Sequence, residues 1–478
     1  MKRTQKLLCL LLALVLVSGA ALAAVLLSPE GDETEGDPGV SVLSLDADTV
    51  TQLGWTYEEE SLSFLLEDDT WVYAEDSTFP LSTSRVEAAL SALCDLTASR
   101  TIEEAEDLAQ YGLEEPTCTV EVTAGDTTTQ LLIGDETTMG GERYLSTGDG
   151  NVYLVDEGFL DNFQYGLYDL VVKETIPSMD DVVRFTVEAE TQTLDLYYLE
   201  DSGLAYSDEY VWFAAASDGT YTALDSDLTL DLIEQVTLLS WGDCVDCKAG
   251  DEALAEYGLA EPAATVTVQY IETVEVETDL TDDDGNPIYD TQENEETFVL
   301  EIGSYTGSSC YARLAGSEMV YLIDATVCDS LLYTTADSLL PQDILLMDWD
   351  TVDSIDVTVD GATYTVVKSV QEVTDDDGST SEETVWTLDG EEVALTSLLS
   401  SLNSLDSAGA APTSEPQRSA QLSFLFHRNT ETFPEVELIF YEYDSTTCLV
   451  SLNGEIRLTA AREDVDGLAE DFLALLPE

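Results

Sequence analysis

Carboxylates and one histidine are the side chains of this chain that could act as acids, bases or nucleophiles. The sequence holds 99 Asp and Glu residues and a single His. A glycosidase needs only two carboxylates at a suitable separation, but among so many candidates any such pair can arise by chance. His427 lies between Phe426 and Arg428 in an alternating segment, which is more typical of a strand residue than of a general base.

The spacings that mark common catalytic and nucleotide-binding sites do not occur in the sequence. There is no P-loop, no G-x-G-x-x-G, no H-E-x-x-H and no G-x-S-x-G. A solvated acidic face accounts for the carboxylates more simply than a hydrolase does. We therefore predict a protein that is not an enzyme, with no catalytic residue and no cofactor.

Cysteine pairs can bind metals or carry redox chemistry, and Cys244-Val-Asp-Cys247 has the C-x-x-C spacing. A structural zinc site needs four ligands, yet no second pair follows and the histidine is distant in sequence. We expect most cysteines to be buried as small hydrophobic side chains. Whether Cys244 and Cys247 pair is left open.

Two aspartate clusters could attract divalent cations. They are Asp282-Asp283-Asp284-Gly285 and Asp375-Asp376-Asp377-Gly378. In an EF-hand the glycine is sixth and the first residue supplies an oxygen ligand, but Leu280 and Val373 stand at that first position. Hairpin turns of the D-G type are the expected structure, and weak binding of divalent cations is the alternative.

The net charge excludes some classes of partner. Fifteen Lys and Arg residues oppose the 99 acidic ones, and Lys2, Arg3 and Lys6 precede the first acid, Glu30. The remaining chain therefore holds 12 basic and 99 acidic residues, a net charge of −87. Such a surface repels phosphate backbones and anionic lipid headgroups. We expect no binding to nucleic acid.

The N-terminal segment 1–27 is predicted to be a membrane anchor or a signal segment. After the three basic residues, Leu7–Leu27 is apolar, and 21 helical residues span about 31 Å, enough for a bilayer core of roughly 30 Å. Ala21-Leu22-Ala23 supplies an alternative cleavage site. In either case we expect the rest of the chain outside the cytoplasm, beginning with a flexible acidic linker at 28–43.

One phrase occurs twice. YGLEEPTCTVEV (Tyr111–Val122) and YGLAEPAATVTV (Tyr257–Val268) share eight of twelve residues. Glycine is suited to the left-handed position that ends a helix, the leucine to the contact that accompanies such an end, and the proline prevents the helix from resuming. The phrase thus predicts a helix end followed by a strand, at Tyr111, Gly112, Leu113 and Pro116 and at Tyr257, Gly258, Leu259 and Pro262.

Two shorter phrases recur in the same order after each copy. They are Ile-Gly, with Gly134 and Gly303, and V-Y-L-[VI]-D, with Tyr153 and Tyr321. A third, degenerate repeat without the YGL phrase is predicted near the C-terminus. We place module 1 at 44–175, module 2 at 176–343 with an acidic insertion at 272–296, and module 3 at 344–478. Units of this length are domains rather than solenoid repeats.

The patterns predict an α+β fold of tandem modules, each built of antiparallel β-hairpins or meanders with short amphipathic helices, after an N-terminal transmembrane helix. We expect strands at Ser63–Leu66 and Trp71–Ala74. A helix at Ser84–Leu96 should be capped by Ser84, with Glu87 completing a capping box. We also expect a short acidic helix at Glu103–Gln110. The insertion has the composition of a long hairpin loop.

The recurring phrases resemble the bacterial family called domain of unknown function 4340, over about Leu53 to Asp360 and in two copies. The resemblance implies a membrane-anchored extracytoplasmic protein, associated with a gliding-motility-type ABC transporter and that transporter's auxiliary subunit. It implies no catalytic residue. Ser304 stands where the first copy has Asp135, which puts a shared polar role there in doubt.

We therefore expect a non-enzymatic, single-pass accessory or scaffold protein of the cell membrane, with most of the chain on the extracytoplasmic side. The alternative is a cell-surface module that binds glycan or peptide, favoured by the aromatic strands.

Overall fold

A computed structural model describes residues 39–190, 192–281, 287–374, 380–416 and 418–476. The expected anchor at 1–27, most of the linker at 28–43 and the two aspartate clusters lie outside these residues. Within them, no helix is both long and apolar enough to cross a membrane. The chain divides into two compact units, with the boundary between Lys173 and Glu174.

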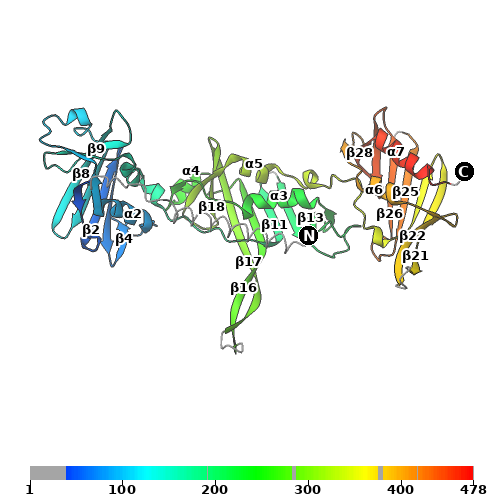
Figure 1. The fold of residues 1–478 in the computed structure, drawn as a ribbon. Coiled ribbons are helices and arrows are strands. Elements are labelled where there is room, and N and C mark those ends of the chain that lie inside the picture. The colour runs from blue at the N-terminus through cyan, green and yellow to red at the C-terminus, as the bar shows by residue number, and fades with distance from the viewer. Residues whose placement is uncertain (1–38, 191, 282–286, 375–379, 417, 477–478) are drawn as a thin grey trace. The chain divides into compact units, whose positions relative to one another are not determined.

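Three large antiparallel sheets dominate the structure (Figure 1), and this confirms the β-rich α+β class with repeated sheets. The first has the order β4-β3-β2-β7-β8-β9-β10-β6, the second β14-β13-β12-β11-β16-β17-β18-β19-β15, and the third β23-β22-β21-β20-β25-β26-β27-β28-β24. In each, a meander of the early strands is followed by a helix, and a second meander then pairs with the first strand of the first meander. The third sheet shares this order although it lacks the YGL phrase.

The first sheet contains β2 (Val50–Tyr57), β3 (Glu60–Glu67), β4 (Thr70–Tyr73), β6 (Arg100–Ile102), β7 (Cys118–Ala124), β8 (Thr127–Glu136), β9 (Glu142–Ser146) and β10 (Val152–Asp156). Beside it, β1 (Val40–Ser44) pairs with β5 (Asp95–Ala98). The helical elements are η1 (Ala47–Thr49), α2 (Thr83–Cys94), η2 (Ala109–Tyr111), η3 (Glu157–Asn162) and η4 (Leu167–Leu170).

The second sheet contains β11 (Asp181–Ala189), β12 (Gln192–Tyr198), β13 (Trp212–Ala215), β14 (Tyr221–Ala223), β15 (Cys244–Asp246), β16 (Ala264–Thr281), β17 (Pro287–Thr306), β18 (Ser309–Leu314) and β19 (Val320–Asp324). Its helical elements are α3 (Ser226–Thr237), α4 (Asp251–Glu256), α5 (Ala325–Tyr333) and η5 (Ala336–Leu339).

The third sheet contains β20 (Val352–Val359), β21 (Ala362–Thr374), β22 (Thr380–Leu388), β23 (Glu391–Val393), β24 (Ser407–Ala410), β25 (Ala420–Arg428), β26 (Glu435–Glu442), β27 (Thr447–Leu452) and β28 (Glu455–Ala461). Its helical elements are η6 (Trp349–Thr351), α6 (Thr396–Asn403) and α7 (Arg462–Leu473).

Strand register makes the three sheets comparable residue by residue. The pairing of β2 with β7 slips by one residue just after Val50, and the pairings of β11 with β16 and of β20 with β25 slip just after Val182 and Val352. A β-bulge is a local, specific feature of a ladder. Its recurrence at one position shows that β2, β11 and β20 are equivalent strands.

The core of each module lies between one face of the sheet and its helices. In the second, Ile233 and Val236 of α3 and Leu331 of α5 pack with the sheet in one buried cluster. In the third, Leu402 of α6 and Phe472 of α7 do the same. Alternate strand residues point to this face, which is why β20 alternates between buried and accessible positions.

A buried tryptophan recurs at one place in the three cores. Trp71, Trp212 and Trp386 lie on β4, β13 and β22, next to the strand that follows the bulged one. A large ring at this position fills the space beneath the helices. The tryptophans precede the first residue of the helix in their modules, which is Thr83, Ser226 or Thr396, by 12, 14 and 10 residues.

Two local predictions for the first module are wrong. The helix α2 begins at Thr83 after Ser82, so Ser84 lies inside it and cannot cap it. The acidic segment Glu103–Gln110 is mostly turns and bends, with a 3-10 turn only from Ala109. Four like charges within five residues oppose a helix there, and Glu104 has a positive φ of 52°. The strands predicted at Ser63–Leu66 and Trp71–Ala74 correspond to β3 and β4.

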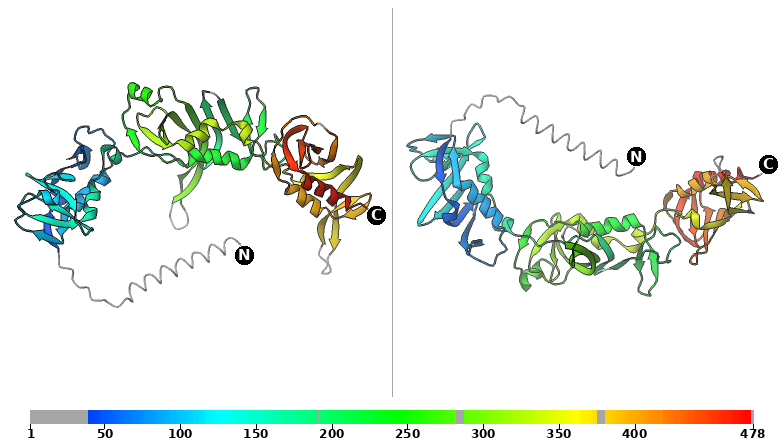
Figure 2. Two further views of the ribbon diagram at one scale, coloured as in Figure 1. Left: turned by 90° about the horizontal axis from the view of Figure 1, so that it is seen from above. Right: turned by 60° about the horizontal axis from the view of Figure 1, so that its bottom comes forward.

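The acidic insertion at 272–296 is a paired ribbon and not an irregular loop. The neighbouring strand β11 follows β16 only to Ile271, and β18 reaches β17 only at Leu300. Beyond these points β16 and β17 pair with each other, without interruption as far as Glu277 and Tyr289 and again, after a shift of register, at Thr281 and Pro287. They form an arm that projects from the second sheet (Figures 1 and 2).

Candidate functional site

The YGL phrase builds a tight junction in the first module. Gly112 ends η2 in the left-handed conformation, with φ of 67°, as the sequence predicted. Leu113 behind it is 2% exposed. The Tyr111 ring packs against that of Tyr144 on β9, with centroids 4.9 Å apart. After Pro116 the chain enters β7 at Cys118, so the segment is a helix end followed by a strand.

The second copy repeats this geometry. Gly258 has φ of 72° and Leu259 is 1% exposed, while the Tyr257 and Tyr311 rings lie 4.6 Å apart. Here the preceding segment, α4, is a true helix. The chain passes Pro262 and enters β16 at Ala264.

The glycine of the Ile-Gly phrase lies directly against the backbone of the YGL segment. A Cβ atom on Gly134 would lie 2.1 Å from the carbonyl oxygen of Tyr111, and one on Gly303 would lie 2.3 Å from that of Tyr257. The backbone N–H of Ser304 donates to the same Tyr257 oxygen at 2.8 Å. Glycine is therefore required because two backbones touch.

The third module explains why the two phrases occur together. Strand register puts Phe440 opposite Leu422, as Ile302 lies opposite Ala264 in the second module. The next residue, Tyr441, therefore takes the place of Gly303. A side chain at this position would clash with a segment placed as the YGL segment is in the other two modules, so the loss of one phrase accompanies the loss of the other.

The V-Y-L-[VI]-D phrase ends the last long strand of each of the first two modules and begins a helical element. The carboxylates of Asp156 and Asp324 accept hydrogen bonds from Gly158 N and Thr326 N, at 2.9 and 2.8 Å, and so cap η3 and α5. In the second module, Val320 packs with Leu259 in a small buried cluster. The repeated phrases thus meet in the fold.

The tyrosines of that phrase make separate polar contacts. Tyr153 donates to Asp149 Oδ2 at 2.6 Å, which raises the pKa of Tyr153 and lowers that of Asp149. Tyr321 accepts from Glu174 N at 2.9 Å, and its ring stacks on Trp241 with centroids 4.4 Å apart. Burial is the main cause of a raised pKa for Tyr321. A phenol held in its protonated form supports structure more than proton transfer.

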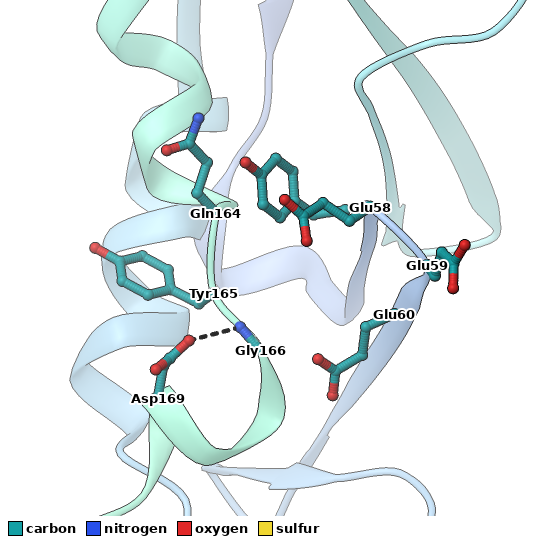
Figure 3. A pocket seen from close by; sticks show the side chains of 8 residues that line it. Glu58, Glu59, Glu60, Gln164, Tyr165, Gly166 and Asp169 are labelled. Carbon is teal, nitrogen blue, oxygen red and sulfur yellow. Dashed lines mark hydrogen bonds between the residues drawn. The ribbon is translucent and has the colours of Figure 1, made fainter. Parts of the chain in front are cut away.

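An acidic hollow of about 580 Å³ lies at the β2–β3 turn of the first module (Figure 3). The side chains of Glu58 and Glu60 are directed toward the loop that contains Tyr165, whereas that of Glu59 points away from it. Gly166 N donates to Asp169 Oδ2 at 2.9 Å. These side chains are exposed apart from that of Tyr165. The hollow can attract cations, but water solvates its carboxylates.

Tyr57 and Tyr165 are the aromatic side chains that line this hollow, and Tyr165 is held by two hydrogen bonds. Its hydroxyl accepts from Arg85 Nη1 at 2.8 Å, and the guanidinium lies 4.8 Å from the ring centroid. Its carbonyl accepts from Trp55 Nε1 at 3.2 Å. The ring is therefore already engaged by a cation of the chain itself.

The other candidate residues from the sequence are His427 and the pair Cys244 and Cys247, and each lies in an environment typical of a structural residue. His427 lies on β25, as predicted, with Nε2 3.0 Å from Asp356 Oδ2. The side chains of Cys244 and Cys247 are buried. Among the described residues, no group of three or more His, Cys, Asp or Glu side chains could hold a metal ion. The recurring tryptophan was not predicted, although its regular place before each helix was a visible signal.

Comparison with known proteins gives one match. The model of the family described as domain of unknown function (DUF4340) matches residues 71–245 and 212–423. The matches begin at Trp71 and Trp212, which are equivalent in the two sheets. No curated protein and no solved structure matches the chain.

Proposed function

This chain belongs to the family described as domain of unknown function (DUF4340), and we propose that it is a non-enzymatic accessory or scaffold protein of an ABC transporter complex. In this proposal the N-terminal segment tethers the chain to the cell membrane. The sheets stand on the extracytoplasmic side and offer surfaces to the transporter or its auxiliary subunit.

The observation that carries the proposal is that the repeated residues pack the backbone and core of a module. Gly134 and Gly303 allow two backbones to touch, while Leu113 and Leu259 fill buried positions. The features that recur in the chain therefore maintain a module, and repetition of a module provides area for protein contacts. The sequence resemblance directs this reading toward a transporter of the gliding-motility type.

Co-purification tests the proposal. The full chain, tagged at its C-terminus and expressed from its own locus, would be isolated from membranes in mild detergent and its partners quantified by mass spectrometry. The proposal predicts stoichiometric enrichment of the transporter subunits. A matched chain whose segment 1–27 is replaced by a cleaved signal peptide should lose most of that enrichment. Repeated recovery of the intact chain without transporter subunits would contradict the proposal.

A cell-surface module that binds glycan or peptide is the second candidate. The six tryptophans are all buried or half-buried, so an exposed row of indole rings does not support glycan binding. One hollow in the second module does favour a ligand. Its lining combines aromatic and acidic side chains.

A further inference from the structure

A groove of about 600 Å³ lies beside the recurring tryptophan of the second module. Its aromatic walls are Tyr198 and Trp212, whose rings meet edge to face with centroids 5.5 Å apart. Acidic side chains and the aliphatic face of α3 complete it, including Asp180, Asp181, Leu230 and Glu234. Leu238 at its edge is 75% exposed. This size is that of a small-ligand site.

The third module fills the equivalent place with its own ammonium group. Tyr198 pairs with Trp212 across β12 and β13, and Lys368 pairs with Trp386 across β21 and β22. The Lys368 Nζ atom lies 5.9 Å from the centroid of the Trp386 ring. It also donates to the carbonyl oxygen of Trp349 at 2.9 Å. Cation and ring attract one another in this arrangement.

In the third module, the segment that precedes β20 also contributes to this site through Trp349. Trp349 and Met179 occupy equivalent positions, because each lies three residues before the first residue of the bulge, which is Val352 in β20 and Val182 in β11. Trp349 Nε1 donates to Asn403 Oδ1 at 2.8 Å, and Asn403 is the last residue of α6. In the second module, Met179 is the shorter side chain, and Thr237, the last residue of α3, lines the open groove.

The first module has different residues in the same region. Leu66 pairs with Trp71 there and supplies an aliphatic side chain. The segment before β2 returns to the end of its helix, because Leu45 N donates to the carbonyl oxygen of Cys94, the last residue of α2. In the second module the ring of Tyr198 takes the place that Lys368 has beside Trp386, and the groove opens next to that ring.

We propose that the groove beside Trp212 binds an alkylammonium group, supplied either by a free amine or by a lysine of a partner protein. The ammonium would lie against the ring of Tyr198, which is 37% exposed beside the buried Trp212. Carboxylates of Asp181 and Glu234 would accept its hydrogen bonds, and its alkyl stem would lie along Leu230. This inference does not depend on the identity of a transporter.

The test is calorimetric titration of the full chain with n-butylammonium, which is the lysine side chain alone, in 0.15 M salt to screen the net charge. The neutral isostere n-butanol is the ligand control. The second ligand is Nα-acetyl-lysine N-methylamide, which presents the same free ε-ammonium group within a peptide. Tighter binding of the peptide form assigns the groove to a protein lysine, and tighter binding of the free amine assigns it to a small amine.

Tyr198→Lys supplies the groove with its own ammonium, as in the third module, and should weaken n-butylammonium binding by about tenfold. Tyr333→Lys changes the charge equally at a position 68% exposed on α5 and outside the groove, and should leave binding unchanged. Glu234→Gln should weaken binding without altering the aromatic pair.

Saturable 1:1 binding of n-butylammonium, weakened by Tyr198→Lys and not by Tyr333→Lys, supports the site. The inference is overturned if binding does not saturate, if n-butanol binds equally well, or if the two lysine variants lose affinity alike. A melting curve of each variant confirms that the second module remains folded, so a loss of binding cannot come from unfolding.

Discussion

Replacing Gly303 by alanine tests whether the Ile-Gly phrase is a packing requirement. The added Cβ would lie 2.3 Å from the carbonyl oxygen of Tyr257 and 3.0 Å from the Leu259 side chain. The first of these atoms is backbone, so no rotation of a side chain relieves the contact. Tyr257 must move, and the hydrogen bond from Ser304 N to its oxygen, 2.8 Å long, must stretch with it.

The expected cost follows from these contacts. Overpacking a well-packed site costs about 1–3 kcal/mol, and weakening one backbone hydrogen bond adds about 0.5–1.5 kcal/mol. Gly303→Ala should therefore destabilise its module by about 2–4 kcal/mol. For a unit of 150–250 residues each kcal/mol lowers the melting temperature by about 2–4 °C, which gives a fall of about 5–15 °C.

Scanning calorimetry of the full chain measures this fall, and hydrogen exchange assigns it to the second sheet, because a chain of several modules does not melt in one transition. Gly467→Ala is the matched control. A Cβ on Gly467 would meet open space inside α7, so alanine there should stabilise by up to about 1 kcal/mol. If Gly303→Ala melts with the wild type, or no lower than Gly467→Ala, the packing argument is refuted.

Three further predictions concern charge and the arm. Melting temperature should rise with moderate salt, because salt screens self-repulsion at a net charge of −84; a flat or falling response would count against this. Hydrogen bonds from Thr446 and Thr447 lower the pKa of Asp444 to about 2, below its usual value of about 3.9. Its carboxylate therefore stabilises the fold above about pH 4 and ceases to do so as pH falls toward 2, so the stability lost in Asp444→Asn should shrink over that range; a constant loss in denaturant titrations would exclude this. Replacing residues 273–293 by Asn-Gly joins two residues that already pair in the arm, so the second sheet should keep its melting temperature, and its unfolding would show that the arm supports the sheet.

Local chemistry allowed the junction to be predicted from sequence. Gly112 has a positive φ because glycine adopts this conformation after a helix end at little cost. The alternation of apolar and polar residues predicts the neighbouring strands. The helix predicted at Glu103–Gln110 does not form, because repulsion between its carboxylates outweighs the helix propensity of its residues. The cap at Ser84 failed because Ser82 stands just before Thr83, two residues earlier.

Features that depend on strand register could not be predicted. The groove requires Tyr198 to lie beside Trp212, and these residues meet only when β12 and β13 pair. Its likeness to the Lys368 site requires two sheets to be aligned through their shared bulge, which leaves no trace in hydrophobic pattern. The absence of the YGL phrase in the third module likewise depends on strand register, which puts Tyr441 at the position of Gly303.

The central claim is an extracytoplasmic protein tethered at its N-terminus, and labelling of Met139→Cys in intact spheroplasts tests it most directly. Met139 is 96% exposed. The cysteines of the described residues are buried apart from Cys94, which is half-buried, so these cysteines contribute little background labelling, and the wild-type chain is the control for Cys9. The account predicts that a membrane-impermeant maleimide labels the variant without lysis and that the label stays with the membrane fraction. Labelling only after lysis would contradict it.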